Sequence, residues 1–221
     1  MTCLFDNYFA IPLTAHTYCK TIEMAFSLDA AYWQERWQQG ATGWDIGQVA
    51  PPLQQFFDQL PQSSLRILVP GAGSGYEAQY LWDKGFRQLV VLDIAPAAIE
   101  AFRQRMPQFP ESQIVCGNFF DHRGEYDLIV EHTFFCALHP SLRSAYAEQM
   151  FNLLAPGGLL AGLLFDDPMT DQPGPPFGGR RDEYLQLFSP RFQILTLERT
   201  EHSIAPRLGR ELFVLLKKPN R

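Results

Sequence analysis

The feature that most constrains the fold of this chain is the alternation of short apolar runs with amphipathic segments. Seven runs have the length and composition of buried strands: 65–70, 88–93, 112–116, 126–130, 159–165, 192–198 and 211–217. Helical segments precede and separate them, at 29–39, 53–60, 76–85, 96–106 and 140–154. Strands that alternate with helices form parallel sheets covered on both faces. We therefore predict an α/β protein with a doubly wound, seven-stranded, mostly parallel sheet.

The same pattern predicts how the chain is divided. No helix separates the last two strands, so we expect a hairpin-like pair with one antiparallel strand at the end of the sheet. Residues 29–221 are predicted to form a single domain, in which the helix at 29–39 is a candidate lid. Residues 1–28 have no periodicity and are interpreted as an N-terminal extension. Whether Met1 or Met24 is the true start stays open.

Composition and charge exclude several classes of protein. With 46% hydrophobic, 14% aromatic and 19% charged residues, the chain is typical of a well-packed globular protein. A net charge of −6 argues against a nucleic-acid partner, because such surfaces neutralise phosphates. No apolar stretch is long enough for a membrane helix, and the N-terminus lacks a secretory pattern. The four cysteines form no CxxC pair, which favours a reduced, cytoplasmic protein. The oligomeric state is undefined, and a monomer is compatible with the sequence.

A glycine-rich loop follows the first predicted strand. It reads Gly71-Ala72-Gly73-Ser74-Gly75, and Tyr76 stands where the dinucleotide fingerprint GxGxxG has its third glycine. Glycines at this point allow a backbone to approach a ligand closely. The GxGxG spacing is typical of S-adenosylmethionine-dependent methyltransferases. It disfavours the competing hypothesis of a nicotinamide-dependent oxidoreductase, and a plain strand–helix turn is the structural alternative.

Further candidate residues stand at the ends of the next two strands. Asp93 ends the second strand, where a carboxylate can accept hydrogen bonds from both hydroxyls of a ribose. Asn118 follows the third strand, where it can bond an adenine amino group, with Phe119 against the ring. The alternative for Asn118 is an Asx turn. Since strand ends meet at one edge of a parallel sheet, these residues together favour an adenosine pocket.

With these residues in place, the chain resembles the thiopurine methyltransferase superfamily, most closely its thiol, thiocyanate and halide methyltransferase branch. The resemblance extends from about Trp33 to Lys217 and rests on segments such as WQERWQQGATGWDIGQVAPPL, LVPGAGSGYEAQ, YDLIVEHTFFCALHPSLR and PMTDQPGPPF. It implies the class I methyltransferase fold, which is Rossmann-like, and S-adenosylmethionine as cofactor with S-adenosylhomocysteine as product. It also implies a small-molecule methyl acceptor.

The resemblance assigns cofactor-binding residues position by position. Those implied are Trp33, Trp37, Trp44, Gly71, Gly73, Asp93, Ile94, Asn118, Phe119 and His132. The chain departs from the family pattern at Asn118, where an acidic residue is usual, and at His132. At this second position the halide branch usually has Tyr and the thiopurine branch Arg. The departure at His132 bears on the acceptor more than on the cofactor.

The acceptor side of the site is predicted less specifically. Candidate substrate-binding residues are Trp44, Pro176, Phe177 and Arg181; the last three stand in or beside the Pro/Gly-rich loop 166–179. A thiolate or halide needs no general base, and His132 is a candidate base if the acceptor is a neutral thiol. Cys136 is interpreted as a small core residue rather than a nucleophile. No metal site is predicted, because the His and Cys spacing fits none.

The sequence therefore predicts a methyltransferase acting on a small soft nucleophile, namely a thiol, hydrosulfide, thiocyanate or a halide ion. Two alternatives stay open: methylation of a thiopurine-type aromatic thiol, and a non-catalytic protein that binds S-adenosylmethionine.

Overall fold

The centre of the computed structural model is a sheet of seven strands in the order β3-β2-β1-β4-β5-β7-β6. The model describes residues 28–61, 64–169 and 173–220, so that residues 1–27 of the predicted extension lie outside the described part. The strands are β1 (Ile67–Pro70), β2 (Leu89–Asp93), β3 (Ile114–Cys116), β4 (Tyr126–His132), β5 (Leu154–Phe165), β6 (Gln193–Arg199) and β7 (Glu211–Lys217). Because β1 to β5 pair in parallel, the predicted doubly wound, mostly parallel sheet is confirmed.

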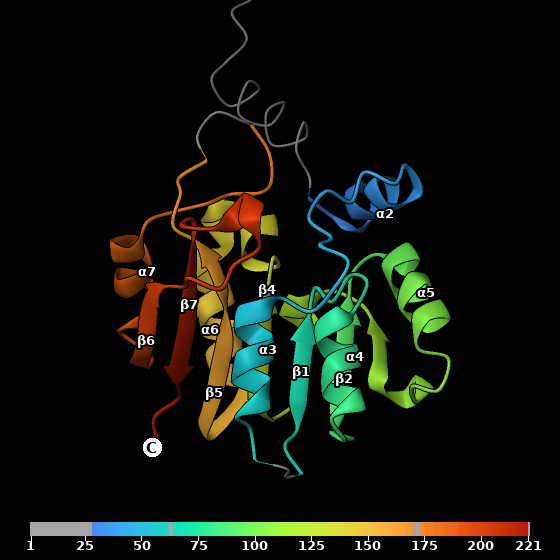
Figure 1. The fold of residues 1–221 in the computed structure, drawn as a ribbon, viewed down its shortest axis with the longest axis horizontal. Helices are drawn as coiled ribbons and strands as arrows, with labels where there is room; N and C mark the ends of the chain where they lie inside the picture. The colour runs from blue at the N-terminus through green and yellow to red at the C-terminus, as the bar shows by residue number, and fades with distance from the viewer. Residues whose placement is uncertain (1–27, 62–63, 170–172, 221) are drawn as a thin grey trace, which may run out of the picture.

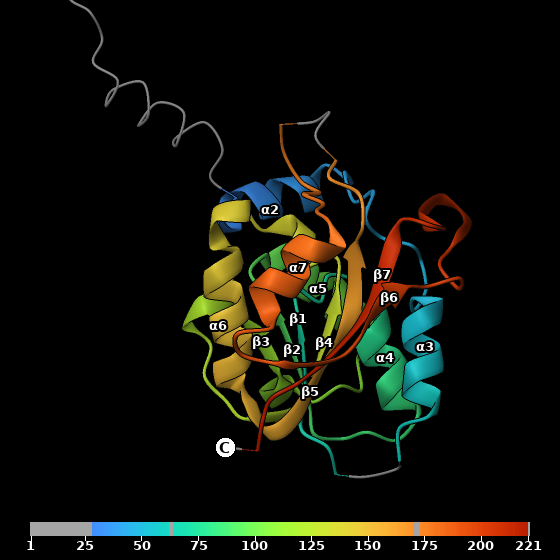
Figure 2. The ribbon, with the colours of Figure 1, turned by 90° about the vertical axis from the view of Figure 1, so that its left-hand side faces the viewer.

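Helices cover both faces of this sheet (Figures 1 and 2). On one face lie α3 (Pro51–Asp58), α4 (Tyr76–Asp83) and α5 (Pro96–Arg105); on the other lie α6 (Arg143–Leu153) and α7 (Arg181–Phe188). Each face has its own buried hydrophobic cluster. The four residues of β1 are all buried, which explains why a continuous apolar run, rather than an alternating one, marks the central strand.

The helix α2 (Ala30–Gln38) lies apart from these layers, above the edge of the sheet where the parallel strands end (Figure 1). The side chain of Asp29 accepts a hydrogen bond from the Tyr32 amide at 3.0 Å, so the predicted N-cap is confirmed. No residue of α2 is fully buried. The Gln34 side chain fastens α2 to α5 by accepting a 2.8 Å hydrogen bond from the Ala97 amide in the first turn of that helix.

Three features of the fold differ from the sequence-based expectation by more than a shift of one or two residues at the end of an element. The antiparallel strand β7 does not lie at the end of the sheet, because it pairs with β5 on one side and with β6 on the other. Strand β5 begins at Leu154, so it includes the proline and glycines predicted to precede it. The segment predicted as one helix from 140 to 154 is a 3₁₀ turn (Pro140–Leu142) followed by α6. The position of β7 and the start of β5 depend on pairing between strands, which local periodicity does not predict.

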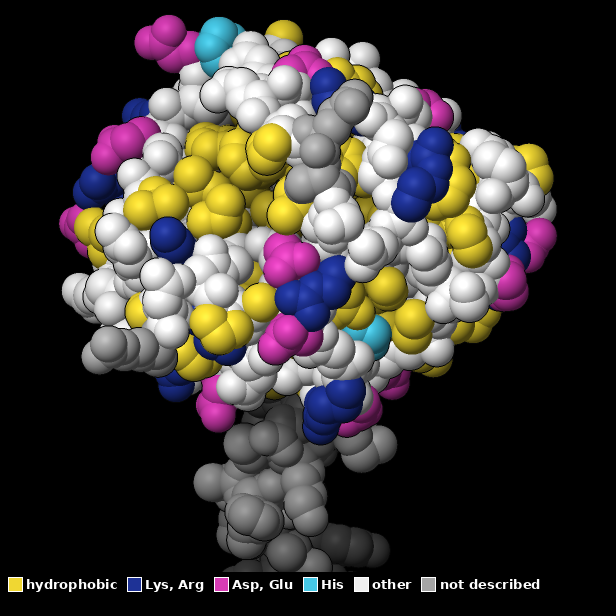
Figure 3. Space-filling view, turned by 90° about the horizontal axis from the view of Figure 1, so that it is seen from below, with side chains coloured by type: hydrophobic (Ala, Val, Ile, Leu, Met, Phe, Trp, Pro, Cys, Tyr) yellow, Lys and Arg dark blue, Asp and Glu magenta, His cyan; other side chains and the backbone are white. Residues whose placement is uncertain are grey.

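The two edges of the sheet differ. At the carboxyl edge the order of the strands reverses between β1 and β4, and ligands of open α/β sheets bind at such a point. The opposite edge, seen in Figure 3, shows acidic and basic side chains close together beside an area of hydrophobic ones. Among the described helices, none combines the length and the apolar character needed to cross a bilayer.

Candidate active site

Two cavities open side by side at the carboxyl edge of the sheet. The first, called here the glycine-loop cavity, has a volume of about 420 Å³ and contains Gly71, Asp93 and Asn118 in its wall. The second, called the arginine cavity, measures about 590 Å³ and includes Arg36, Arg207 and Arg210. Trp33 and Ala137 belong to both walls. The cavities therefore meet at these two residues.

The glycine loop forms a floor between β1 and α4. Gly71 has a φ of +58°, and a Cβ atom built there would lie 2.4 Å from the ring of Phe134. Only glycine combines that backbone conformation with so close an approach. Gly73, at φ +53°, lies under Trp37 and Trp44, whose nearest atoms would be 3.5 and 3.9 Å from a Cβ. The loop thus packs directly against the tryptophans that the sequence singled out.

The carboxylate of Asp93 lies at the end of β2 and is buried, with 8% of the residue exposed. One oxygen accepts the Gly73 amide and the other accepts the Ala95 amide, both at 2.9 Å. Burial raises the pKa of Asp93, and these backbone donors counteract that shift. The carboxylate has more acceptor sites than the backbone amides occupy, so a buried acceptor faces the glycine-loop cavity at the point predicted to bind a ribose.

The part of this cavity that is predicted to hold adenine is mostly apolar. Leu92, Ile94, Phe119 and Phe134 contribute to its wall. Asn118 does so too, while its side-chain oxygen accepts a 3.1 Å hydrogen bond from the Phe120 amide. The Asx-turn interpretation of Asn118 is therefore confirmed. Asn118 also faces the cavity, and its bond to an adenine amino group stays a prediction.

The three predicted tryptophans form one cluster. The ring of Trp44 lies edge-on to Trp33 and Trp37, at centroid distances of 5.5 and 6.2 Å. Trp33 and Trp37 come from α2, and Trp44 comes from the loop that follows it. Asp45 holds this loop against the glycine loop through a short hydrogen bond from the Ser74 hydroxyl. The cluster closes over the junction of the two cavities.

The turn that follows β4 contributes Thr133, Cys136 and Ala137 to the wall of the arginine cavity. Thr133, a β-branched residue in this wall, has a φ of +61°. Such a conformation is strained and is concentrated at functional sites. Its carbonyl accepts a hydrogen bond from the Cys136 thiol, at 3.3 Å. Burial raises the pKa of Cys136 to about 12, so this thiol is neutral and is no nucleophile.

His132 belongs to a buried polar network behind the arginine cavity. Its Nδ1 lies 2.9 Å from Glu77 Oε1, and its Nε2 lies 3.1 Å from Arg207 Nη1. Since arginine only donates, Nε2 must carry the lone pair and Nδ1 the proton. Burial alone would raise the pKa of Glu77, but its bonds from His132 and the Ala50 amide outweigh burial and keep that pKa low. Both ring nitrogens of His132 are thus engaged, and this geometry gives no support to its predicted role as a base.

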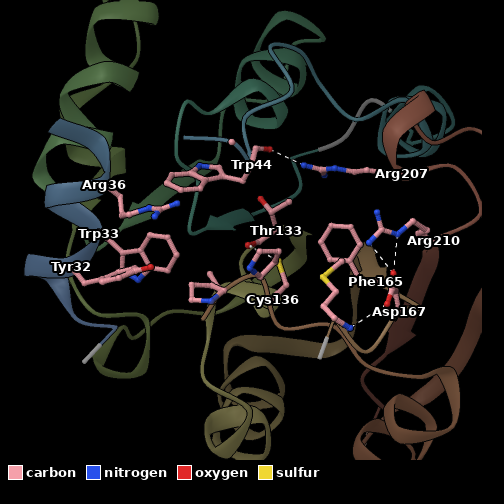
Figure 4. Close-up of a pocket in the computed structure, with 15 residues that line it drawn as sticks. Tyr32, Trp33, Arg36, Trp44, Thr133, Cys136, Phe165, Asp167, Arg207 and Arg210 are labelled. Carbon is pink, nitrogen blue, oxygen red and sulfur yellow. Dashed lines mark hydrogen bonds and ion pairs between the residues drawn. The ribbon is translucent and has the colours of Figure 1, made fainter. Parts of the chain in front are cut away.

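Arg207 connects the network to the tryptophan cluster. It donates a 2.8 Å hydrogen bond to the carbonyl oxygen of Trp44, as Figure 4 shows, and pairs with Glu211 at 3.4 Å. Its guanidinium also lies over the ring of Phe165, 5.6 Å from the centroid. The bond to its carbonyl oxygen therefore fixes the backbone of Trp44, and with it the position of the indole ring.

The structure separates two predicted substrate residues from the cavities. Arg181 donates to the Leu197 carbonyl and pairs with Glu198 at 2.8 Å, with 41% of its side chain exposed. The Phe177 amide donates to the Cys136 carbonyl at 2.7 Å, and its ring lies against His139. Neither side chain is part of a described cavity wall, whereas Pro176 is.

Sequence reasoning missed several residues of the site. The positive charge of the arginine cavity comes from Arg36, Arg207 and Arg210. The loop after α2 is joined to the glycine loop by the hydrogen bond between Asp45 and Ser74. The helical spacing of Arg36 from Trp33 was an available signal, because residues three apart share a face. The others become neighbours only through the fold. Within the described residues, no group of three His, Cys, Asp or Glu side chains has the arrangement of a metal site.

The fold and this site define a class I S-adenosylmethionine-dependent methyltransferase. The glycine-loop cavity fits the cofactor, since a buried carboxylate faces it and the rest of its wall is largely apolar and aromatic. A solved structure with the same fold is the 1,6-didemethyltoxoflavin-N1-methyltransferase of Burkholderia thailandensis, determined with bound S-adenosylhomocysteine. Its TM-score is 0.68 at 18% identity, and the match covers 97% of this chain and 93% of that one.

Sequence comparison identifies the family. The model of the thiopurine S-methyltransferase family matches residues 28–213. A probable thiol methyltransferase 2 of Arabidopsis thaliana is 32% identical over 193 residues, covering 84% of each chain. A thiocyanate methyltransferase 1 of Brassica oleracea is 33% identical over 195 residues, or 85% of each. The thiopurine S-methyltransferase of Nitrosospira multiformis is 26% identical, over 85% of this chain and 97% of that protein. The chain belongs to the thiopurine S-methyltransferase family, as its sequence predicted.

Proposed function

We propose that this protein transfers the methyl group of S-adenosylmethionine to a small soft nucleophile: a thiol, hydrosulfide, thiocyanate or a halide ion. The observation that carries this proposal is the meeting of two cavities at Trp33 and Ala137. A cofactor in the glycine-loop cavity would have its reactive end at this junction, where it meets an acceptor in the arginine cavity. The names of the thiol and thiocyanate methyltransferase relatives support this acceptor class.

The walls of the glycine-loop cavity suggest how the cofactor is held. The acceptor capacity that these amides leave on Asp93 would bind the ribose hydroxyls through charged hydrogen bonds, which are stronger than neutral ones. Ile94 and Phe119 would pack against the adenine, and Asn118 would bond its amino group. When bound, the cofactor supplies an electrophilic methyl group on a cationic sulfur.

The chain's own groups then position and shield the reaction. Trp33 and Trp44 exclude water from the junction, and their π faces attract positive charge. Holding donor and acceptor in line at roughly 3–3.5 Å lowers the barrier of such a displacement, because the entropy of bringing them together is lost on binding. Gly71 and Gly73 provide the close floor that this alignment needs.

We expect the acceptor to arrive already deprotonated. His132 has both ring nitrogens bonded, and Cys136 is protonated at neutral pH. Glu131, the carboxylate next to them in sequence, is fully buried and bonds the Phe134 and Phe135 amides and the Tyr146 hydroxyl. With these candidate bases engaged, an anionic nucleophile such as a thiolate, thiocyanate or halide suits the site best.

One observation favours the aromatic thiol as a second candidate acceptor. The arginine cavity, at about 590 Å³, falls in the size range of pockets for drug-sized molecules, well above the volume of a halide. Pro175 and Pro176, from the loop after β5, are part of its wall. An aromatic thiolate also arrives as an anion, so the argument against a base applies to it equally.

The test is the release of S-adenosylhomocysteine from S-adenosylmethionine with iodide, thiocyanate, hydrosulfide or an aromatic thiol, each compared with a blank lacking acceptor. We expect turnover with the small anions. Turnover mainly with the aromatic thiol would replace the small acceptor by the thiopurine-type one. If none of the four acceptors gives turnover although S-adenosylhomocysteine still binds, the proposal is overturned in favour of a non-catalytic binding protein.

A further inference from the structure

The arginine cavity carries more positive charge than its own carboxylates neutralise. Arg210 forms two contacts with Asp167, at 2.9 and 2.8 Å, so that these opposite charges compensate each other. Arg207 pairs with Glu211 and donates a second hydrogen bond to the carbonyl oxygen of Trp44. Both guanidinium groups thus have acceptors within the protein.

Arg36 is different. Its Nε atom is buried and has no hydrogen-bond partner in the described part of the chain. The contact found there for its guanidinium is with the face of Trp44, 5.9 Å from the ring centroid. Figure 4 shows this side chain extending from α2 between Trp33 and Trp44, with no dashed line to the other residues drawn. A buried donor without an acceptor is costly, at about 1–3 kcal/mol, so the site is incomplete as it stands.

The position of Arg36 points to the acceptor rather than to the cofactor. Trp33 and Trp37, on either side of it in the same helix, both contribute to the glycine-loop cavity, whereas Arg36 is described only in the wall of the arginine cavity. Guanidinium is weakly hydrated and presents several donors in one plane. It therefore suits a large, soft, weakly hydrated anion or a thiolate.

We propose that Arg36 binds the negative charge of the methyl acceptor and so selects anionic acceptors in the arginine cavity. This inference rests on the proposed function, because it assigns a role within the same site. Arg36 is a specificity-determining residue: its donors fix the anion beside the tryptophan cluster at the junction of the two cavities. The charge of Arg36 also offsets the cost of removing the anion from water.

The first test measures binding without turnover. With S-adenosylhomocysteine present, iodide is titrated while tryptophan fluorescence is followed. Iodide bound beside Trp44 should quench this fluorescence to a plateau, whereas free iodide quenches it in proportion to the iodide concentration. Arg36→Gln is expected to abolish the saturable part. Arg191→Gln removes the same charge far from both cavities, where Arg191 faces Glu148, and should leave it unchanged. Saturable quenching of equal strength in Arg36→Gln would overturn the inference.

The second test measures kinetics with whichever acceptor turns over. Arg36→Gln should raise its KM about tenfold or more, as loss of a charged hydrogen bond implies, with the affinity for S-adenosylhomocysteine unchanged. Arg36→Lys, which keeps the charge, should recover most of that loss. A fall in S-adenosylhomocysteine affinity with no change in KM would instead place Arg36 at the cofactor. Because the iodide titration needs no turnover, failure of this inference and failure of the proposed function are distinguishable.

Discussion

At the scale of single residues, the site depends on polar groups that each do two things. Asp93 joins the glycine loop to β2 by accepting the Gly73 and Ala95 amides, and the same carboxylate faces the cavity. Asn118 caps a turn and lines the cavity, and Arg207 binds both Glu211 and the carbonyl of Trp44. Substitution of such a residue therefore affects stability and binding together, and a test must measure both.

Asp93→Ala is expected to weaken S-adenosylhomocysteine binding by about 1.5–3 kcal/mol, or roughly 10- to 150-fold, because charged hydrogen bonds to the ribose are lost. Calorimetric titration measures the affinity, and urea unfolding of the same variant measures the cost of leaving two amides without an acceptor. Asp83→Ala, at the exposed end of α4, is the matched control. An affinity equal to that of the unchanged protein would remove Asp93 from the cofactor site.

At the scale of elements, the end of β4 and the 3₁₀ turn Phe135–Ala137 are fastened by one carboxylate. Glu131 accepts the Phe134 and Phe135 amides at 2.8 Å and the Tyr146 hydroxyl at 2.6 Å. Complete burial raises the pKa of Glu131 to about 7 in spite of these donors. Ala137, which belongs to both cavity walls, stands on this turn, so the state of Glu131 bears on the junction.

The raised pKa predicts a pH dependence of stability. A carboxyl whose pKa is higher in the folded protein than in the unfolded chain stabilises the fold while protonated, and this contribution falls as pH rises from about 4.5 to 7. Over that window, the unfolding free energy should fall by roughly 3 kcal/mol relative to Glu131→Gln, which does not titrate. Urea unfolding at pH 5, 6, 7 and 8 measures this difference. Glu148→Gln, exposed on α6, serves as control, and a difference independent of pH would contradict the prediction.

How much of these elements the sequence predicts depends on the range of the interactions that form them. Local periodicity and capping predicted the strands and helices, including the N-cap at Asp29. The position of β7 between β5 and β6 depends on pairing between distant strands, and no local pattern reports it. The same limit explains why sequence reasoning chose Arg181 as a substrate residue and missed Arg207. In sequence, Arg181 and Arg207 both stand in segments between predicted helices and strands, and only the fold places one beside Glu198 and the other behind Trp44.

At the scale of the whole molecule, the two cavities lie between the rigid sheet and a helix that is weakly held. None of the residues of α2 is fully buried, and its link to α5 includes the single side chain of Gln34. Yet α2 supplies Trp33 and Trp37 to the glycine-loop cavity. A ligand between α2 and the sheet adds contacts that the free protein lacks. Its binding should therefore raise the free energy of local unfolding of α2.

Hydrogen exchange tests this prediction directly. If opening of α2 releases the cofactor product, S-adenosylhomocysteine at 100 times its Kd should stabilise the closed helix by about 2.7 kcal/mol, which slows exchange up to roughly a hundredfold. The protection should be confined to residues 30–38 and the glycine loop. The internal control is α7, whose exchange should stay unchanged because its residues face neither cavity. Equal exchange of α2 with and without ligand would show that the helix does not close over the site, and the predicted lid would be wrong.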